Sequence, residues 1–290
     1  MVEGDGAEVR VERWDMRAAE ILAPIWGEFK ACVFTSGTLS PVSAFAETIG
    51  LDSYRYARAG LPYDLSRVKT VVVRGLSTRG EELSAEMAYR YRQAVKLFLE
   101  GFKANVAVYF SSYRVMDELV DAVAEAAEAL GRRVFIERQG MRGHEAKAML
   151  EEFRKCARSR SGVLCATMTG KFSEGVDFPG RQLEGAFLVG IPFDRVTTRT
   201  RVYLQYYVSR YGRVRGVYYA YVVPALRRVA QAMGRVLRSS DDRALFILGD
   251  ERYAKPSYFE LLPEYAKSTA EGASYTRIKR VAEEFDEATS

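Results

Sequence analysis

The sequence predicts an α/β fold with a mostly parallel sheet. Seven short runs of apolar and β-branched residues alternate with longer segments of helical periodicity along almost the whole chain of 290 residues. Each run is continuously apolar, which is typical of strands buried on both faces. Because parallel strands are joined by crossover connections, usually helices, this alternation favours one sheet covered by helices on both sides.

The expected elements follow in chain order. The predicted strands are 31–35, 69–73, 105–110, 133–137, 162–167, 185–190 and 244–249. The predicted helices are 15–28, 41–49, 82–100, 113–130, 143–157, 198–210 and 224–238. In the helix 113–130, Val115, Leu119 and Val123 recur at helical spacing, and Gly131 directly after it is a typical helix stop. Residues 256–290 are expected to form helical segments that end in a polar tail.

Composition restricts the classes of protein to consider. Hydrophobic residues make up 48% and charged residues 28% of the chain, as in an ordinary globular domain. No apolar run approaches the ~20 residues needed to span a bilayer, and the acidic N-terminus does not resemble a signal peptide. We therefore expect a cytoplasmic protein, associated with the nucleoid if the source is archaeal or bacterial. Cys32, Cys156 and Cys165 are too scattered for a disulfide framework, and no metal site is predicted.

The basic residues are unevenly distributed. Of 43 basic residues 33 are arginine, and residues 195–240 hold ten arginines without a lysine or an acid. Seven tyrosines lie between Tyr203 and Tyr221. One interpretation is a surface for phosphates and bases, since arginine binds phosphate bidentately and both side chains stack on bases. The other is a core of tyrosines beneath a solvated arginine face. Because a solvated face normally mixes both signs, nucleic-acid or phosphate contact is favoured.

A self-sufficient nucleotide site is missing from the sequence. No Gly-x-x-x-x-Gly-Lys-Ser/Thr occurs, and Gly170-Lys171 is followed by Phe172 where a Mg²⁺-binding hydroxyl would stand. There is no Asp-Glu-x-His box. The only histidine, His144, lies in a polar helix start and is expected to be exposed. The chain is therefore not expected to hydrolyse a nucleotide by itself.

Three polar segments directly follow predicted strands. They are "TSGTLSP" (35–41), "FSSY" (110–113) and "TGKFSEGVDF" (169–178). Ligands of parallel sheets bind at the carboxyl ends of the strands, so these segments are expected at one edge. The helix carrying "QAMGRVLRSS" (231–240) could direct its arginines towards that edge, and Arg235 and Arg238, three residues apart, would share one helical face.

Together these segments resemble half of a motor protein. "GKFSEGVDF" (170–178), "IPF" (191–193), "QAMGRVLRS" (231–239) and "DERY" (250–253) are similar to motifs five and six of superfamily 2 DNA helicases. "FTSGTLSP" (34–41) resembles their third motif, and "VVVRGLSTRGEELS" (71–84) and "VAVYFSSYRVMDEL" (106–119) resemble the segments around motif four. The order and spacing are those of the XPD family of iron–sulfur helicases and the related DinG group, and are most similar to archaeal XPD proteins.

The resemblance implies a RecA-like parallel sheet sandwiched by helices, the second helicase domain, and assigns roles by position. In such motors ATP lies between two RecA-like domains, and the second inserts arginines. The residues matching the catalytic positions are Arg235, Arg238 and Gln231. Those matching ATP-coupling positions are Gly175, Asp177, Glu174 and Gly234. Those matching DNA-binding positions are Ser36, Gly37, Thr38, Ser112, Tyr113, Lys171 and Ser173.

The departures from the family pattern are equally informative. The Walker lysine, the Asp-Glu-x-His box, the four-cysteine cluster and the arch insertion belong to the half that precedes "TSGTLSP" in the family. We therefore expect an N-terminal helicase half as partner, ATP with Mg²⁺ shared with it, an iron–sulfur cluster only in that half, single-stranded DNA as ligand, and no membrane partner. The expected domains are 1–40 with an N-terminal helix and the motif-three strand, for which a remnant of helicase domain 1 is one interpretation, 41–255 as RecA-like helicase domain 2, and 256–290 as a C-terminal helical tail.

The expected function is the C-terminal motor domain of an ATP-dependent 5′–3′ DNA helicase, with DNA repair as its expected setting. The alternative is a non-catalytic nucleic-acid-binding or protein-interaction module derived from a helicase domain. The sequence alone leaves open whether the chain is a fragment, a truncated product or a subunit of a split helicase.

Overall fold

The structure is a computed structural model that describes residues 2–4, 9–80, 82–158, 161–173 and 176–289. The chain divides into two compact units, which are described separately. One unit comprises Met1–Ala59 and Phe193–Pro224, and the other comprises Gly60–Pro192 and Ala225–Ser290. The predicted domain boundaries at residues 40 and 255 stay a prediction.

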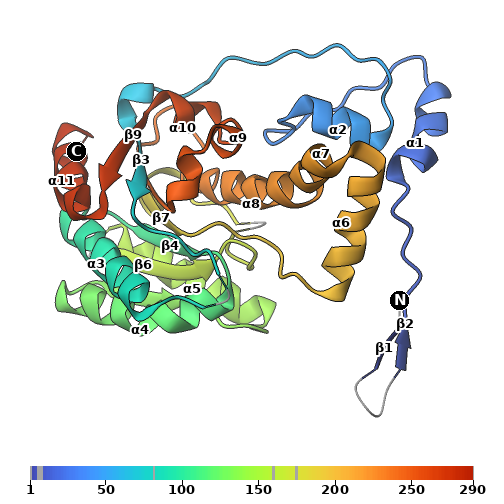
Figure 1. Ribbon diagram of the computed structural model, residues 1–290. Coiled ribbons are helices and arrows are strands. Elements are labelled where there is room, and N and C mark those ends of the chain that lie inside the picture. Colours follow the sequence, from blue (N-terminus) through green and yellow to red (C-terminus); the bar gives the residue numbers. More distant parts are fainter. Residues whose placement is uncertain (1, 5–8, 81, 159–160, 174–175, 290) are drawn as a thin grey trace. The chain divides into compact units, whose positions relative to one another are not determined.

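The larger unit is built on a seven-stranded, all-parallel sheet, which confirms the predicted fold class (Figure 1). The order across the sheet is β5-β6-β4-β7-β8-β3-β9. The strands are β3 (Val68–Arg74), β4 (Val106–Phe110), β5 (Arg133–Ile136), β6 (Gly162–Thr167), β7 (Gly185–Val189), β8 (Ala244–Gly249) and β9 (Ala270–Ser274).

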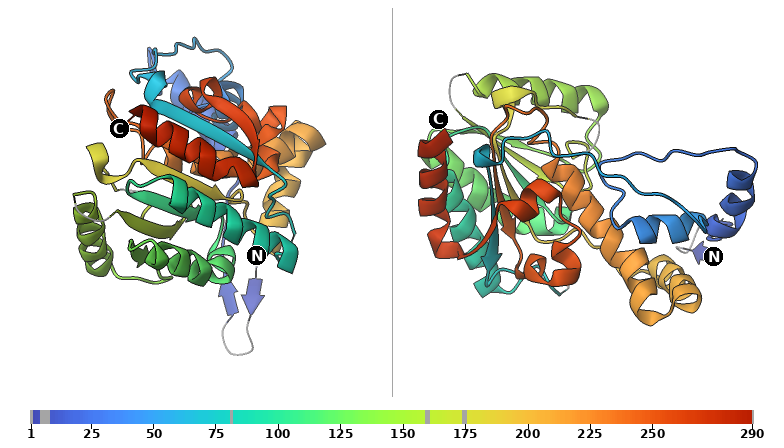
Figure 2. Two further views of the ribbon diagram at one scale, coloured as in Figure 1. Left: turned by 90° about the vertical axis from the view of Figure 1, so that its left-hand side faces the viewer. Right: turned by 90° about the horizontal axis from the view of Figure 1, so that it is seen from above.

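Helices cover both faces of this sheet. They are α3 (Ala85–Gly101), α4 (Tyr113–Ala129), α5 (Gly143–Cys156), α8 (Val223–Met233), α9 (Pro256–Phe259), α10 (Glu264–Ser268) and α11 (Ile278–Thr289). In Figure 2, α3, α4 and α11 lie on one side of the strands, with α5 and α8 on the other. Short 3-10 turns lie at Leu65–Arg67, Gly180–Gln182, Glu251–Ala254 and Tyr275–Arg277.

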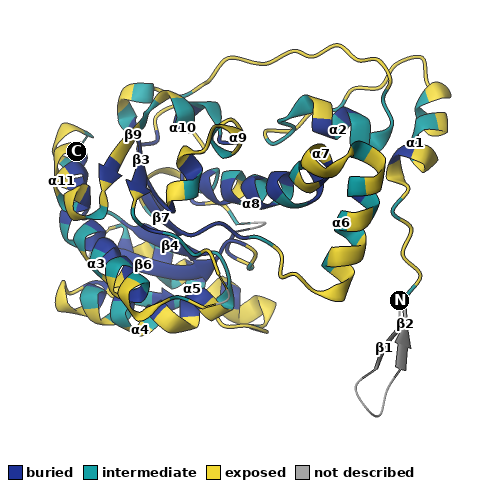
Figure 3. Ribbon diagram, in the orientation of Figure 1, coloured by how far each residue is buried: buried dark blue, intermediate teal, exposed yellow. Residues whose placement is uncertain are grey.

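The inner strands β3, β4, β6, β7 and β8 are almost entirely buried, as their apolar runs predict, whereas the edge strands β5 and β9 are more exposed (Figure 3). Because successive side chains point to opposite faces, Val106, Val108 and Phe110 of β4 pack under α3 and α4, in one core with residues of α11. Tyr109, between them, points to the other face and is fully buried. The inner strand β4 therefore separates two apolar layers.

Three sequence-based expectations for individual elements are wrong. Residues 31–35 form no strand, and the last 35 residues are not purely helical, because Ala270–Ser274 pair in parallel with β3 as the edge strand β9. The segment AEGAS contains no apolar run, so the sequence did not predict a strand there. In the structure only Ala273 of this edge strand is buried. The helix predicted to reach residue 238 ends at Met233.

The smaller unit contains β1 (Val2–Gly4), β2 (Val9–Val11), α1 (Ala18–Gly27), α2 (Val42–Ile49), α6 (Thr198–Tyr211), α7 (Arg213–Val217) and a π-helical turn at Tyr218–Val222. Tyr207 and Tyr219 are buried with Ala44 and Ala220 in its core. Tyr203, Tyr206, Tyr211 and Tyr218 pack against them half-buried. The tyrosine-rich segment thus supplies the core of this unit, while most of its arginines are exposed. Among the described residues, no helix is long and apolar enough to cross a membrane.

Buried charge links the sheet to its last helix. Arg243, directly before β8, is 8% exposed and forms ion pairs with Glu184 at 2.9 Å and with Asp286 of α11 at 3.0 Å. Glu184 is also buried. All three residues belong to the larger unit, and Arg243 and Glu184 lie at the amino-terminal edge of the strands.

Replacing Arg243 by alanine is expected to lower the free energy of unfolding by about 3–5 kcal/mol, because two carboxylates lose their buried partner. Replacing Arg280 on the exposed face of α11 is the matched control. Its ion pair with Glu284 is open to solvent, so a loss below about 1 kcal/mol is expected. Urea denaturation of both variants measures the difference, and equal losses would contradict this assignment.

Candidate functional site

The polar loops of the larger unit meet at the carboxyl-terminal edge of its strands. Backbone hydrogen bonds continue past the strand ends, from Ser111 N–H to Val189 O at 3.0 Å and from Met168 N–H to Phe110 O at 2.8 Å. They hold the loops after β4, β6 and β7 next to one another. Two of the three predicted segments, 110–113 and 169–178, are therefore brought together at this edge.

The loop after β4 is short and begins a helix. Ser112 is the N-cap of α4, and its hydroxyl accepts a hydrogen bond from Val115 N–H at 3.3 Å. Tyr113 is the first residue of that helix and is half-buried. Burial raises the pKa of the Tyr113 hydroxyl, and the negative charge of Glu137 raises this pKa further. The phenol therefore stays protonated and keeps its capacity to donate a hydrogen bond.

The loop after β6 begins with a tight turn over Glu137. Lys171 N–H donates to Glu137 Oε1 at 2.7 Å, and Thr167 N–H donates to Oε2 at 2.9 Å. The Lys171 side chain is exposed, and its amine donates to the carbonyl of Met141. Ser173 is fully buried, and its hydroxyl donates to Gly170 O at 2.7 Å.

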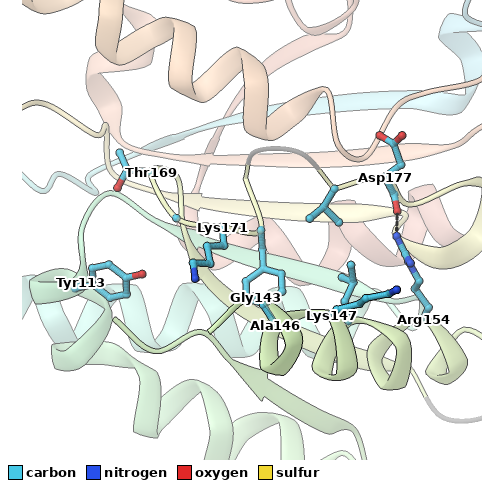
Figure 4. A pocket seen from close by; sticks show the side chains of 12 residues that line it. Tyr113, Gly143, Ala146, Lys147, Arg154, Thr169, Lys171 and Asp177 are labelled. Atoms are coloured by element: carbon cyan, nitrogen blue, oxygen red, sulfur yellow. Dashed lines mark hydrogen bonds between the residues drawn. The ribbon is translucent and has the colours of Figure 1, made fainter. Parts of the chain in front are cut away.

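A pocket of about 650 Å³ lies between this loop, the start of α4 and one face of α5 (Figure 4). Its lining includes Tyr113 and Lys171. From α5 it includes Gly143 and two basic residues, Lys147 and Arg154. Gly143 is the first residue of α5, so the pocket includes the positive end of a helix. Cations, an aromatic ring and a helix N-terminus suit a polyanion better than an apolar ligand.

Asp177 has its two functional ends on opposite sides of the loop. Its backbone carbonyl accepts a hydrogen bond from Arg154 in the pocket, while its carboxylate points away from the pocket (Figure 4). That carboxylate lies 2.5 Å from Arg238 Nη2 and 3.7 Å from Arg235 Nη1. The loop therefore separates a pocket on one side from a pair of arginines on the other.

Arg235 and Arg238 differ in what their guanidinium groups contact. Arg235 donates from Nε to Ser173 O and from Nη1 to Val176 O, both at 2.9 Å, and its side chain is only 16% exposed. Arg238 is 38% exposed and Asp177 is 72% exposed. Both arginines lie beyond the end of α8, so a shared helical face is not what brings them together. The turn after Met233 does so, and Asp242 accepts from Arg238 N–H at 2.8 Å within it.

The remaining predicted positions have simpler surroundings. Gln231 is exposed on α8, and Gly234 N–H donates to Ala230 O where that helix ends. Glu174 and Gly175 lie outside the described residues. Ser36, Gly37 and Thr38 form a turn in the smaller unit, in which Thr38 N–H donates to Ser36 Oγ at 3.2 Å. His144 is exposed as predicted.

Three residues of this site were not predicted from the sequence. Lys147 and Arg154 lie seven residues apart, two turns of α5, and this spacing was the available signal. Glu137 ends the predicted strand 133–137 and directly follows β5 in the structure, and its signal was a carboxylate at the same edge of the sheet as the predicted loops. Among the described ranges, no cluster of three or more histidine, cysteine, aspartate or glutamate side chains is placed to hold a metal ion.

The contrast between the two arginines leads to a stability prediction. Arg235→Ala is expected to lower the free energy of unfolding by about 1–3 kcal/mol, because two loop carbonyls lose their donor. Arg238→Ala should cost less than about 1 kcal/mol, because its partner is solvent-exposed. Chemical denaturation of the two variants in parallel checks both values. A larger loss for Arg238→Ala than for Arg235→Ala would contradict the described contacts.

Comparison with known proteins agrees with the resemblance seen in the sequence. The chain is 26% identical over 271 residues to the XPD helicase subunit of general transcription and DNA repair factor IIH of Schizosaccharomyces pombe, covering 89% of this chain and 35% of the relative. It is 27% identical over 234 residues to a probable ATP-dependent helicase of Methanocaldococcus jannaschii, covering 77% and 34%. The chain thus spans about a third of the length of these relatives.

Solved structures give the same result for the fold. A structure of an XPD helicase superposes with a TM-score of 0.59 and 20% identity over 82% of this chain and 42% of that one. A second XPD structure, in the apo form, superposes with a TM-score of 0.62 and 19% identity, and the match covers 82% of this chain and 47% of that one. The helicase C-terminal domain family matches residues 95–269, more than half of the chain. The chain therefore belongs to the helicase C-terminal domain family, as an XPD-like superfamily 2 C-terminal half with a RecA-like sheet.

Proposed function

We propose that this chain is the second motor domain of an ATP-dependent 5′–3′ DNA helicase. It supplies arginine fingers to ATP and part of a track for single-stranded DNA. The observation that carries the proposal is the loop 169–178. On one side of it lies a basic pocket, and on the other Asp177 meets Arg235 and Arg238. A motor needs such a connection between its nucleotide and its nucleic acid, whereas a simple binding module does not.

The arginine side suits a nucleotide phosphate. The ion pair between Arg238 and Asp177 is solvent-exposed, so it contributes little free energy and is readily exchanged for a stronger partner. ATP bound with Mg²⁺ supplies a phosphoryl group on which negative charge develops. Guanidinium groups bind such oxygens bidentately, and an arginine finger contributes roughly 10³–10⁵ in rate. Arg235 holds the loop, and Arg238 is the arginine free to reach the phosphate.

The pocket side suits the DNA backbone. Lys147 and Lys171 would bind phosphates as point charges, and the N-terminus of α5 adds favourable backbone N–H groups. Tyr113 lies in the same pocket and offers a ring on which a base can stack. Ser112, which caps α4 immediately before Tyr113, extends this surface. Ser173 would act indirectly, because its buried hydroxyl shapes the loop that presents Lys171.

The complete motor requires a partner. The Walker lysine and the Asp-Glu-x-His box of the first helicase domain are missing from this sequence. An N-terminal helicase half would supply them, along with the shared Mg²⁺ and, if it carries the family's cysteines, an iron–sulfur cluster. Ser36, Gly37 and Thr38 would then relay the nucleotide state between the halves. The isolated chain is proposed to bind DNA weakly and to have no ATPase activity.

Binding of an oligothymidylate to the isolated chain should weaken with salt. A plot of log affinity against log salt concentration has a negative slope. The magnitude of this slope is expected to decrease by about 0.7 for each of Lys147→Ala and Lys171→Ala, since each removes one phosphate contact. Lys155→Ala is the control. It lies on the same helix, but outside the pocket and paired with Glu152, so its slope should equal that of the wild type. Fluorescence anisotropy measures all four proteins, and unchanged slopes in both pocket variants would refute this surface.

ATP hydrolysis should appear only when the chain is mixed with a cognate N-terminal half and single-stranded DNA. Arg238→Ala should then lower the DNA-stimulated rate by roughly 10³-fold or more, and Arg235→Ala should abolish it. Arg280→Ala, on the exposed face of α11, should leave the rate unchanged. Because Arg238→Ala is expected to fold normally, a reconstituted rate equal to the wild type would exclude Arg238 as the finger. Failure of the mixture to hydrolyse ATP would favour the non-catalytic alternative.

A further inference from the structure

Glu137 is a buried carboxylate to which the proposed function assigns no role. It lies one residue beyond β5 and is 1% exposed. Its own backbone N–H donates to Cys165 O at 2.8 Å, which fixes its main chain against β6. Burying a carboxylate is costly unless its oxygens are hydrogen-bonded. The partners of Glu137 therefore indicate what the residue does.

Those partners include one backbone N–H at the end of β6 and one in the loop that follows it. Oε1 accepts from Lys171 N–H at 2.7 Å, and Oε2 accepts from Thr167 N–H at 2.9 Å, with the Thr167 hydroxyl 3.4 Å away. The two oxygens thus bind both ends of the turn 167–171. Charged acceptors of this kind form shorter and stronger hydrogen bonds than neutral ones. A glutamine at this position could accept at only one end, because its amide nitrogen would face an N–H donor.

Gly170 lies in the middle of the same turn and fits closely against the carboxylate. A Cβ atom built on Gly170 would lie 2.2 and 2.3 Å from the two carboxylate oxygens of Glu137. Real Cβ atoms do not approach other atoms so closely, so any side chain there would displace either the turn or Glu137. The turn and the carboxylate therefore specify each other.

The turn determines where the pocket begins. Thr169, Gly170 and Lys171 all line the pocket. Because Glu137 binds the backbone N–H of Lys171, it also fixes the point from which the Lys171 side chain extends. The hydroxyl of Tyr113, another residue that lines the pocket, is also within the electrostatic reach of Glu137. One buried carboxylate thus touches the loop after β6 and influences the first residue of α4.

We infer that Glu137 is a positioning residue that holds the turn 167–171 in the geometry that presents Lys171 to a DNA phosphate. The inference rests on the proposed function for its ligand, but the hold on the turn itself is independent of that ligand. Glu137 does not contact DNA. Its effect on DNA affinity passes through the position of the Lys171 backbone.

The test uses the full 290-residue chain and two separate measurements. Glu137→Gln is expected to speed amide hydrogen exchange in residues 167–173, and to weaken oligothymidylate binding about tenfold, because one loop N–H loses its acceptor. Gly170→Ala is expected to give the same two effects through the collision of its Cβ with the carboxylate. In a Glu137→Ala background that collision is removed. Gly170→Ala should then cause a much smaller loss of oligothymidylate affinity than it does in the wild type.

Glu184→Gln is the matched control, since Glu184 is a buried carboxylate at the opposite edge of the sheet. It should lower stability while leaving loop exchange and DNA affinity unchanged. The inference would be overturned if residues 167–173 of Glu137→Gln exchanged their amide hydrogens at the wild-type rate. It would also be overturned if the losses of DNA affinity caused by Glu137→Ala and Gly170→Ala were fully additive in the double variant. If the wild type fails to bind oligothymidylate, the proposed function fails, and the exchange data still decide whether Glu137 holds the turn.

Discussion

All seven strands of the sheet run in one direction, and the candidate functional site depends on this constraint. Parallel strands place all their carboxyl ends at one edge, so the loops after β4, β6 and β7 meet there although they are far apart in the sequence. Not every backbone group of these loops pairs with another backbone group. Side chains such as Arg235 and Glu137 therefore satisfy their polar groups, as buried carbonyl and N–H groups require.

Two sets of ion pairs at opposite edges of this sheet differ in their exposure to solvent. At the amino-terminal edge, Arg243 joins Glu184 and Asp286 in a closed network that fastens α11. At the carboxyl-terminal edge, Arg238 and Asp177 are paired but open to solvent. The first arrangement favours stability, and the second leaves the arginine available for another partner.

The sheet and most of its helices could be predicted because their residues are buried in regular patterns. Continuous apolar runs marked six of the seven strands, and the periodicity of residues 113–130 marked α4 almost to the residue. β9 escaped prediction because an edge strand with one buried residue has no apolar run, and 31–35 misled because an apolar run alone does not make a strand. At the site, Asp177, Arg238 and Tyr113 were identified by family resemblance. Glu137 was not, because its place at the end of a predicted strand was the only sequence signal, and its hydrogen bonds to the backbone of Thr167 and Lys171 appear only in the structure.

Asp177 has a consequence for how the two sides of its loop communicate. A single residue offers its carbonyl to Arg154 and its carboxylate to Arg238. Any ligand that draws Arg238 away changes the environment of the peptide unit that Arg154 binds. If, as the proposed function implies, a ligand on the arginine side alters affinity in the pocket, thermodynamic linkage requires occupancy of the pocket to alter the affinity of the arginine side by the same factor. Reciprocity of this kind needs no large movement, only one residue shared by two equilibria.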